Sequence, residues 1–234
     1  MKSLRTISLT LAMLLSSGIA SAAPVLRAEI TVSAPVVTVG DMFDDAGVLA
    51  EQPLFRSPLP GTTGNVDLAA VRSATARIGL TRFDINGLSQ VRVSRAASIV
   101  DQTLLADLIT QDLRHRGILG DGMTAEMLFA NPPETITVAA SETPAKLENL
   151  RYLPGNGTFS ARFSLAGQTQ PLDLNGSIEI SIEAPHLAAG LPAGTVLRPD
   201  HIIMRPMPIQ QADARGIASL DQLVGMALNR QSRD

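Results

Sequence analysis

The sequence predicts a strand-rich α+β fold. Over most of 134–183, apolar residues alternate with polar ones, which is the pattern of strands with one buried face. Two other segments, 67–79 and 101–116, repeat their apolar residues at helical spacing. We therefore expect an N-terminal α/β module, followed by an antiparallel β-meander packed on a helix.

The N-terminal module is expected over 23–96. Ile30 and Val32 alternate with polar neighbours, as in a half-buried strand, and 36–39 forms a second short strand. Three prolines and two glycines make 53–64 irregular.

The helix of this module is predicted over 67–79. Asp67 is a suitable N-cap, and Gly79 stands where a C-terminal glycine belongs. A strand at 90–94 then closes the module.

The second module is expected over 97–183 and begins with the most regular helix, 101–116. Ser98 to Asp101 resembles a capping box, and Gly117 ends the helix. Its apolar stripe consists of Leu104, Leu105, Leu108, Ile109 and Leu113.

The meander follows the helix. Its strands are predicted at 135–139, 147–152, 159–165, 172–174 and 178–182. Turns are predicted at 154–157 and at Asn175–Gly176. Asn156 and Asn175 also match the glycosylation pattern, but Asn-Gly is explained by the turns alone. A third segment, 184–234, is rich in Pro, Gly, Leu and Met.

The first 22 residues have the three parts of a cleavable secretory signal. Lys2 and Arg5 precede a nine-residue apolar core, and Ala20-Ser-Ala22 is a small-residue cleavage site. This core is too short to span a bilayer, and no second apolar run of membrane length occurs. The sequence predicts an exported protein without a membrane span.

Composition excludes several function classes. Removal of 1–22 leaves 17 basic against 22 acidic residues, a formal charge of −5, so the cationic footprint of a nucleic-acid binder is missing. The chain has no cysteine, which excludes thiol catalysis and disulfide exchange. It has no Trp and one Tyr, which disfavours stacking of sugars or quaternary amines.

The acidic cluster of Asp41, Asp44 and Asp45 has two interpretations. Carboxylates at short spacing suit a hard cation such as Ca²⁺, but the spacing does not match the calcium loop. We favour a turn in which these side chains cap backbone groups.

The three histidines are His115, His186 and His201. His186 and His201, with Asp200 adjacent, could form a metal or acid–base pair, yet no zinc spacing is present. Surface or turn histidines are the favoured interpretation.

The sequence also contains no nucleophile elbow and no phosphate-binding loop. We therefore predict no catalytic, cofactor-binding or metal residue, and a protein that is not an enzyme but acts through its surfaces.

Three N-terminal segments and two C-terminal ones resemble a known family. Val36–Phe43, Phe55–Gly61 and Ala70–Leu80 resemble the flagellar basal-body P-ring formation protein FlgA, of alphaproteobacterial type. Leu191–Ile202 and Leu223–Arg230 resemble the start of a SAF domain, the small β-clip module that ends this family.

The resemblance implies a periplasmic chaperone for P-ring assembly. Its partners would be the P-ring subunit, FlgI-like, and the flagellar rod, and the family carries no cofactor or catalytic residue. Family members continue past the segment at 223–230, so the resemblance implies a partial SAF module over 184–234, in a shortened member or a truncated reading frame. The alternatives are a SAF-domain pilus or secretion assembly protein, and a periplasmic glycan-binding module.

Overall fold

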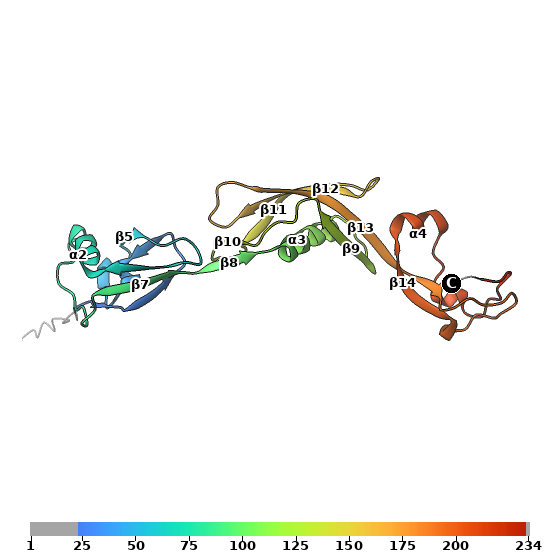
Figure 1. Ribbon diagram of the computed structural model, residues 1–234, viewed down its shortest axis with the longest axis horizontal. Helices are drawn as coiled ribbons and strands as arrows, with labels where there is room; N and C mark the ends of the chain where they lie inside the picture. The colour runs from blue at the N-terminus through green and yellow to red at the C-terminus, as the bar shows by residue number, and fades with distance from the viewer. Residues whose placement is uncertain (1–22, 233–234) are drawn as a thin grey trace, which may run out of the picture. The chain divides into compact units, whose positions relative to one another are not determined.

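The computed structural model describes residues 23–232 (Figure 1). The predicted signal peptide, 1–22, lies outside the described residues. The chain forms two compact units. The first holds the described residues up to Pro58 together with Thr63–Arg95, and the second holds Leu59–Thr62 and the described residues from Ala96 onward.

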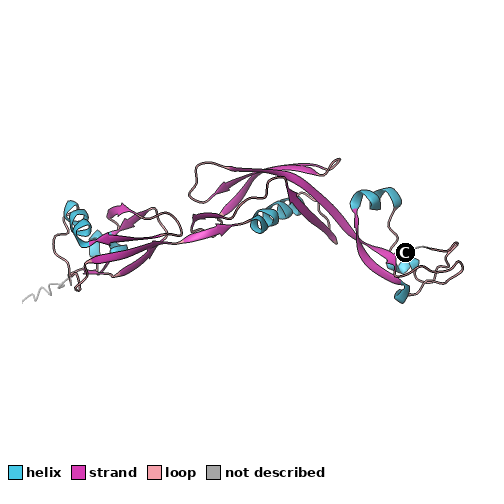
Figure 2. Ribbon diagram, in the orientation of Figure 1, coloured by secondary structure: helices cyan, strands magenta, loops and turns pink. Residues whose placement is uncertain are grey.

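The predicted fold class is confirmed. About 40% of the described residues lie in strands and 21% in helices, so strands dominate both units (Figure 2). The finer division into domains at 96/97 and 183/184 stays a prediction. One strand runs without interruption across 183/184.

The first unit is built on a three-stranded sheet in the order β2-β7-β6. Its strands are β2 (Glu29–Val32), β6 (Thr63–Asp67) and β7 (Gln90–Arg95); β2 runs parallel to β7 and β6 antiparallel to it. Two small antiparallel pairs accompany it: β1 (Val25–Leu26) with β4 (Phe43–Asp44), and β3 (Val36–Thr38) with β5 (Pro53–Arg56). The prediction that 53–64 is irregular was wrong at both ends of this range. Its first residues lie in β5, and its last residues begin β6.

The helices of this unit are α1 (Val39–Met42), the 3-10 turn η1 (Gly47–Leu49) and α2 (Leu68–Arg77). The predicted helix at 67–79 is confirmed, although the side chain of Asp67 makes no capping hydrogen bond. A left-handed φ of +84° at Gly79 follows the helix end, where only glycine is unstrained. The buried core of the unit includes Val37, Val39, Met42, Phe43, Val71, Val91 and Val93.

The second unit is built on a five-stranded antiparallel sheet. Its strands are β9 (Met123–Phe129), β11 (Ala145–Leu153), β12 (Thr158–Leu165), β13 (Leu172–Leu187) and β14 (Ile202–Pro208). The order is β11-β12-β13-β14, and β9 also pairs with β13. A separate pair joins β8 (Ala97–Val100) to β10 (Ile136–Ala139).

Helix α3 (Gln102–His115) lies beside this sheet (Figure 1) and contributes buried residues to the core of the unit. Leu105, Ile109 and Leu113 are fully buried, which confirms the predicted apolar face. The capping box predicted at Ser98 was wrong. Asp101 itself is the N-cap and accepts a hydrogen bond from the Leu104 N–H at 2.9 Å, because the residues before it are drawn into β8.

One predicted turn is confirmed and one is wrong. Residues 154–157 join β11 to β12, and Gly157 has a left-handed φ of +69°. Asn175–Gly176, in contrast, lies inside β13. A Cβ on Gly176 would collide with the backbone oxygen of Leu128 in β9, so this glycine permits a close approach of strands instead of a turn.

The C-terminal residues contain the 3-10 turn η2 (Pro199–His201), α4 (Ile209–Arg215) and α5 (Leu220–Leu223). The segments at 194–197 and 225–228 lie side by side, because backbone hydrogen bonds join Leu197 to Gly225 and Met226, and Leu228 to Thr195. Among the described residues, no helix is long and apolar enough to cross a bilayer.

Candidate partner-binding surface

The acidic cluster near the start of the chain has a structural role. The carboxylate of Asp41 accepts hydrogen bonds from the N–H and the hydroxyl of Thr38, which closes a capping box on α1. Asp44 forms an ion pair with Arg27 at 2.7 Å, and Asp45 adopts a left-handed φ of +57°. The predicted backbone cap is therefore confirmed for Asp41 and the predicted turn for Asp45, whereas Asp44 lies in β4 and pairs with a side chain. Among the side chains that the structure describes, no group of three His, Asp or Glu could hold a metal ion.

The structure does not bring the three histidines together through a shared partner among the described hydrogen bonds. His115 lies in the last turn of α3. The strand register places His186 and His201 near the same end of the β13–β14 pair, but their rings bond to different groups. Nδ1 of His186 lies 3.0 Å from the Ala184 carbonyl, and Nε2 of His201 lies 3.4 Å from the guanidinium of Arg198. Asp200 pairs with Arg198 at 3.5 Å.

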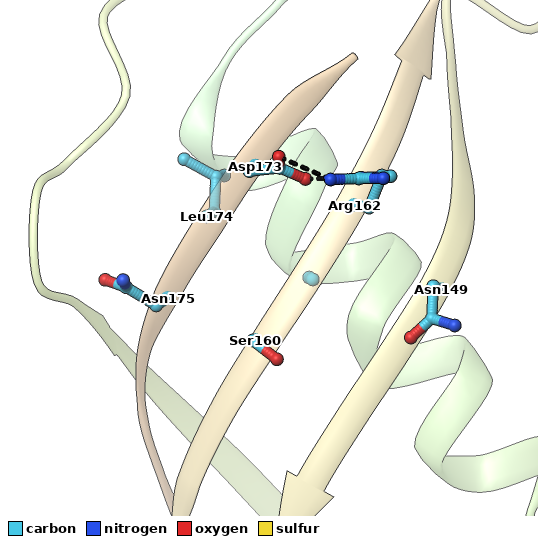
Figure 3. A pocket seen from close by; sticks show the side chains of 7 residues that line it. Asn149, Ser160, Arg162, Asp173, Leu174 and Asn175 are labelled. Atoms are coloured by element: carbon cyan, nitrogen blue, oxygen red, sulfur yellow. Dashed lines mark hydrogen bonds and ion pairs between the residues drawn. The ribbon is translucent and has the colours of Figure 1, made fainter.

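A polar groove of about 400 Å³ lies over β11, β12 and β13 (Figure 3). At its centre, Arg162 donates two hydrogen bonds to the carboxylate of Asp173, at 2.7 and 2.8 Å. These bonds lower the pKa of Asp173 below its ordinary value and raise the pKa of Arg162. Asn149, Ser160 and Asn175 line the groove around this pair (Figure 3). Arg162 and Asp173 neutralise each other, so the groove offers no unpaired charge at its centre.

The edge of the sheet at β9 has different chemistry. Odd-numbered residues of β13 hydrogen-bond toward β9, as the bond from the Ala130 N–H to the Asn175 carbonyl shows. The register then directs the backbone groups of the even-numbered residues of β9 toward β13. The N–H groups of Ala125, Met127 and Phe129 therefore point away from the sheet, and no described residue pairs with them.

The other long edges of this sheet are blocked. Pro206 and Pro208 occupy positions of β14 whose N–H would point outward, and Pro185 does the same at the free end of β13. On β11, a bulge lies between Leu147 and Asn149, and Arg116 donates to the outward carbonyl of Leu150 at 3.0 Å. Prolines and bulges are standard protections against strand addition, and β9 has neither.

An apolar groove of about 530 Å³ lies at the end of β9. Leu128, Phe129, Phe159 and Gly176 contribute to its lining. Leu128, which lines this groove, is 72% exposed. The lining of this groove comes from the last residues of β9 and from the neighbouring parts of β13 and β12.

The exposed face beside this edge is acidic. Glu126 of β9 and Glu179 of β13 lie directly opposite each other, and both are exposed. Like charges at directly opposed positions destabilise a strand pair. None of the ion pairs among the described side chains involves either residue.

Comparison with known proteins gives one structural likeness. No protein-family model and no curated protein matches the chain. The crystal structure of the flagellar protein FlgA from Thermotoga maritima MSB8 is similar with a TM-score of 0.30 and 16% sequence identity. The similarity covers 91% of this chain and 74% of that one.

Sequence reasoning did not find the β9 surface. The segment at 123–129 has apolar residues at alternate positions, but only Thr124 is β-branched, and no strand was predicted there. The signal that could have found it is this alternation, from Met123 through Ala125 and Met127 to Phe129.

Proposed function

We propose that this protein is a periplasmic assembly factor for the flagellar P ring, which binds the P-ring subunit without catalysing a reaction. The proposal joins the exported N-terminus expected from the sequence to the resemblance of its segments to the FlgA family. In the first unit, two of those segments supply core residues: Val37, Val39, Met42 and Phe43 from one, and Val71, Ala74 and Leu80 from the other. The resemblance thus falls on residues that define the fold of the module.

The observation that carries the proposal is the unpaired edge of β9 beside an exposed apolar groove. An edge strand with free N–H and C=O groups can add a strand from another protein, and this mode of recognition needs no catalytic group. A chaperone for a ring subunit needs such a surface, because it must hold a polypeptide before that polypeptide reaches its neighbours in the ring.

The proposal is tested in cells by deletion and complementation. Deletion of the gene is expected to abolish P rings in isolated basal bodies and to abolish swimming, and a plasmid copy should restore both. Intact P rings in the deletion strain would contradict the proposal. A pilus defect with normal motility would favour the role in pilus or secretion assembly.

Export and partner capture are tested separately. The N-terminus of the purified periplasmic protein should begin at Ala23. Photo-crosslinkers placed singly on the two units should capture the P-ring subunit from the periplasm. Retention of the chain in the cytosolic fraction would exclude the periplasmic role, whatever the fold.

A further inference from the structure

We propose that the free edge of β9 binds an extended, basic segment of a partner protein as an added β-strand. In this arrangement a Lys or Arg of the partner lies opposite Glu126, and an apolar side chain lies over Leu128. This inference deepens the proposed function by specifying the chemistry of the bound segment. It can be tested without knowing which protein supplies that segment.

The backbone of β9 supplies the first part of the argument. Ala125, Met127 and Phe129 present unpaired N–H groups at alternate positions, which is the spacing that an antiparallel or parallel neighbour requires. Because β14 and the free end of β13 carry outward-facing prolines, strand addition is directed to β9.

The charge of the exposed face supplies the second part. A strand added beside β9 would place one side chain directly opposite Glu126, with the two Cβ atoms roughly 5 Å apart. Glu126 already faces Glu179 on its other side, so a cation at that position relieves a like-charge contact in addition to forming its own pair. An acidic side chain there would place three carboxylates in one row.

The two faces of β9 define the apolar positions of the segment. Ala125 and Met127 pack at the margin of the core of the second unit, so residues opposite them extend an apolar surface. Leu128 lies on the exposed face and lines the apolar groove, to which Phe129 and Phe159 also contribute. The expected segment alternates apolar and basic residues, except that an apolar residue faces Leu128.

A second copy of this chain fits the edge less well. Pairing of two β9 edges would bring two Glu126–Glu179 pairs onto the face of one continuous sheet. Four carboxylates with no described cation between them oppose such a dimer, whereas a basic segment neutralises the face.

The test uses residues 23–234 and a fluorescent eight-residue peptide in which Val and Lys alternate. Matched peptides carry Glu in place of Lys, or N-methyl groups on alternate backbone amides. Fluorescence anisotropy at low salt should show binding of the Val–Lys peptide. The Val–Glu and N-methylated peptides should bind at least about tenfold more weakly, and binding of the first should weaken with salt.

Variants of the protein test whether the peptide binds at β9. Ala125→Pro removes an outward N–H without breaking a bond to β13 and should weaken binding about tenfold or more. Met204→Pro, its matched control, removes an outward N–H from the already blocked edge of β14 and should leave binding unchanged. Glu126→Lys should also weaken binding about tenfold, whereas Glu183→Gln, on the same face opposite Pro206, should not.

The outcomes separate this inference from the proposed function. Glu126→Lys changes an exposed side chain and relieves repulsion from Glu179, so we expect this variant to fold. It therefore tests binding even if Ala125→Pro lowers the Tm. Equal binding of the Val–Lys and Val–Glu peptides, or equal effects of Ala125→Pro and Met204→Pro, would overturn the inference. So would a concentration-dependent dimer that Ala125→Pro abolishes. P rings lost on deletion but restored by Ala125→Pro would leave the proposed function standing without this site.

Discussion

Gly176 in β13 lies against the backbone carbonyl of Leu128 in β9. Its other neighbour is the ring of Phe159, whose nearest atom would be 2.9 Å from a Cβ placed on the glycine. This three-strand contact joins β9 to the rest of the sheet at the apolar groove. Any side chain at position 176 would push either β9 or Phe159 out of place.

Gly176→Ala is therefore expected to destabilise the second unit by about 1–3 kcal/mol, the usual cost of overpacking a tight site. Urea unfolding followed by far-UV circular dichroism measures the change. Gly155→Ala is the matched control, because nothing lies within 4 Å of a Cβ there and its φ is not left-handed. Equal stability of the two variants would show that the strands separate easily at this point.

Replacement of the α3 cap is expected to weaken the helix. Asp101→Ala removes the hydrogen bond to the Leu104 N–H and should cost about 1 kcal/mol. Asp107→Ala, in the exposed middle of the same helix, should have almost no effect, because alanine is the better helix former. Thermal unfolding of both variants measures the difference, and a larger loss from Asp107→Ala would contradict the assigned cap.

The ion pair between Arg162 and Asp173 predicts a pH dependence. Because the pKa of Asp173 is lowered from its ordinary value of 3.8, the folded protein binds a proton at this site less readily than the unfolded chain. The stabilising contribution is present above that ordinary value and is lost as the pH falls through the lowered one. Both side chains are exposed, so the effect on stability is small and is reduced by salt.

NMR titration of the Asp173 carboxyl carbon measures this directly. In Arg162→Gln the pKa of Asp173 should return toward its ordinary value. In Arg92→Gln, which removes the exposed partner of Glu29 in the other unit, it should stay low. An unchanged titration in Arg162→Gln would show that the hydrogen bonds do not persist in solution.

The acidic cluster of the first unit is expected to respond to mutation and not to calcium. Asp41→Ala removes the half of the α1 capping box in which the Asp41 carboxylate accepts from the Thr38 N–H, and should cost about 1 kcal/mol. Glu51→Ala, at an exposed position nearby in sequence, is the control. Millimolar Ca²⁺ should leave the Tm of the wild-type protein unchanged, and a rise in Tm would restore the cation-site interpretation.

Much of the fold could be predicted because its signals are local. The stripe of Leu105, Ile109 and Leu113 identifies α3, and Asn156–Gly157 identifies the β11–β12 hairpin. The turn predicted at Asn175–Gly176 was wrong because glycine occurs in two different structural settings. It favours turns, and it also permits close approach of a neighbouring strand, and only the position of Leu128 distinguishes the two.

The β9 surface could not be predicted for a different reason. Whether an edge is free depends on which strands pair, and residues 124–128 pair with residues about fifty positions later in the chain. The meaning of Pro206 and Pro208 also depends on that pairing, because a proline blocks an edge only where its nitrogen faces outward.

The length of β13 has a consequence for how the chain folds. This one strand pairs with β9, β12 and β14, so within the five-stranded sheet only the β11–β12 hairpin can form before β13 is available. Local hairpins close within microseconds, whereas pairings of long sequence separation are slow. A chain that emerges from its N-terminus first therefore passes through a stage in which β9 is unpaired on both sides. At that stage the nascent protein is itself prone to aggregate.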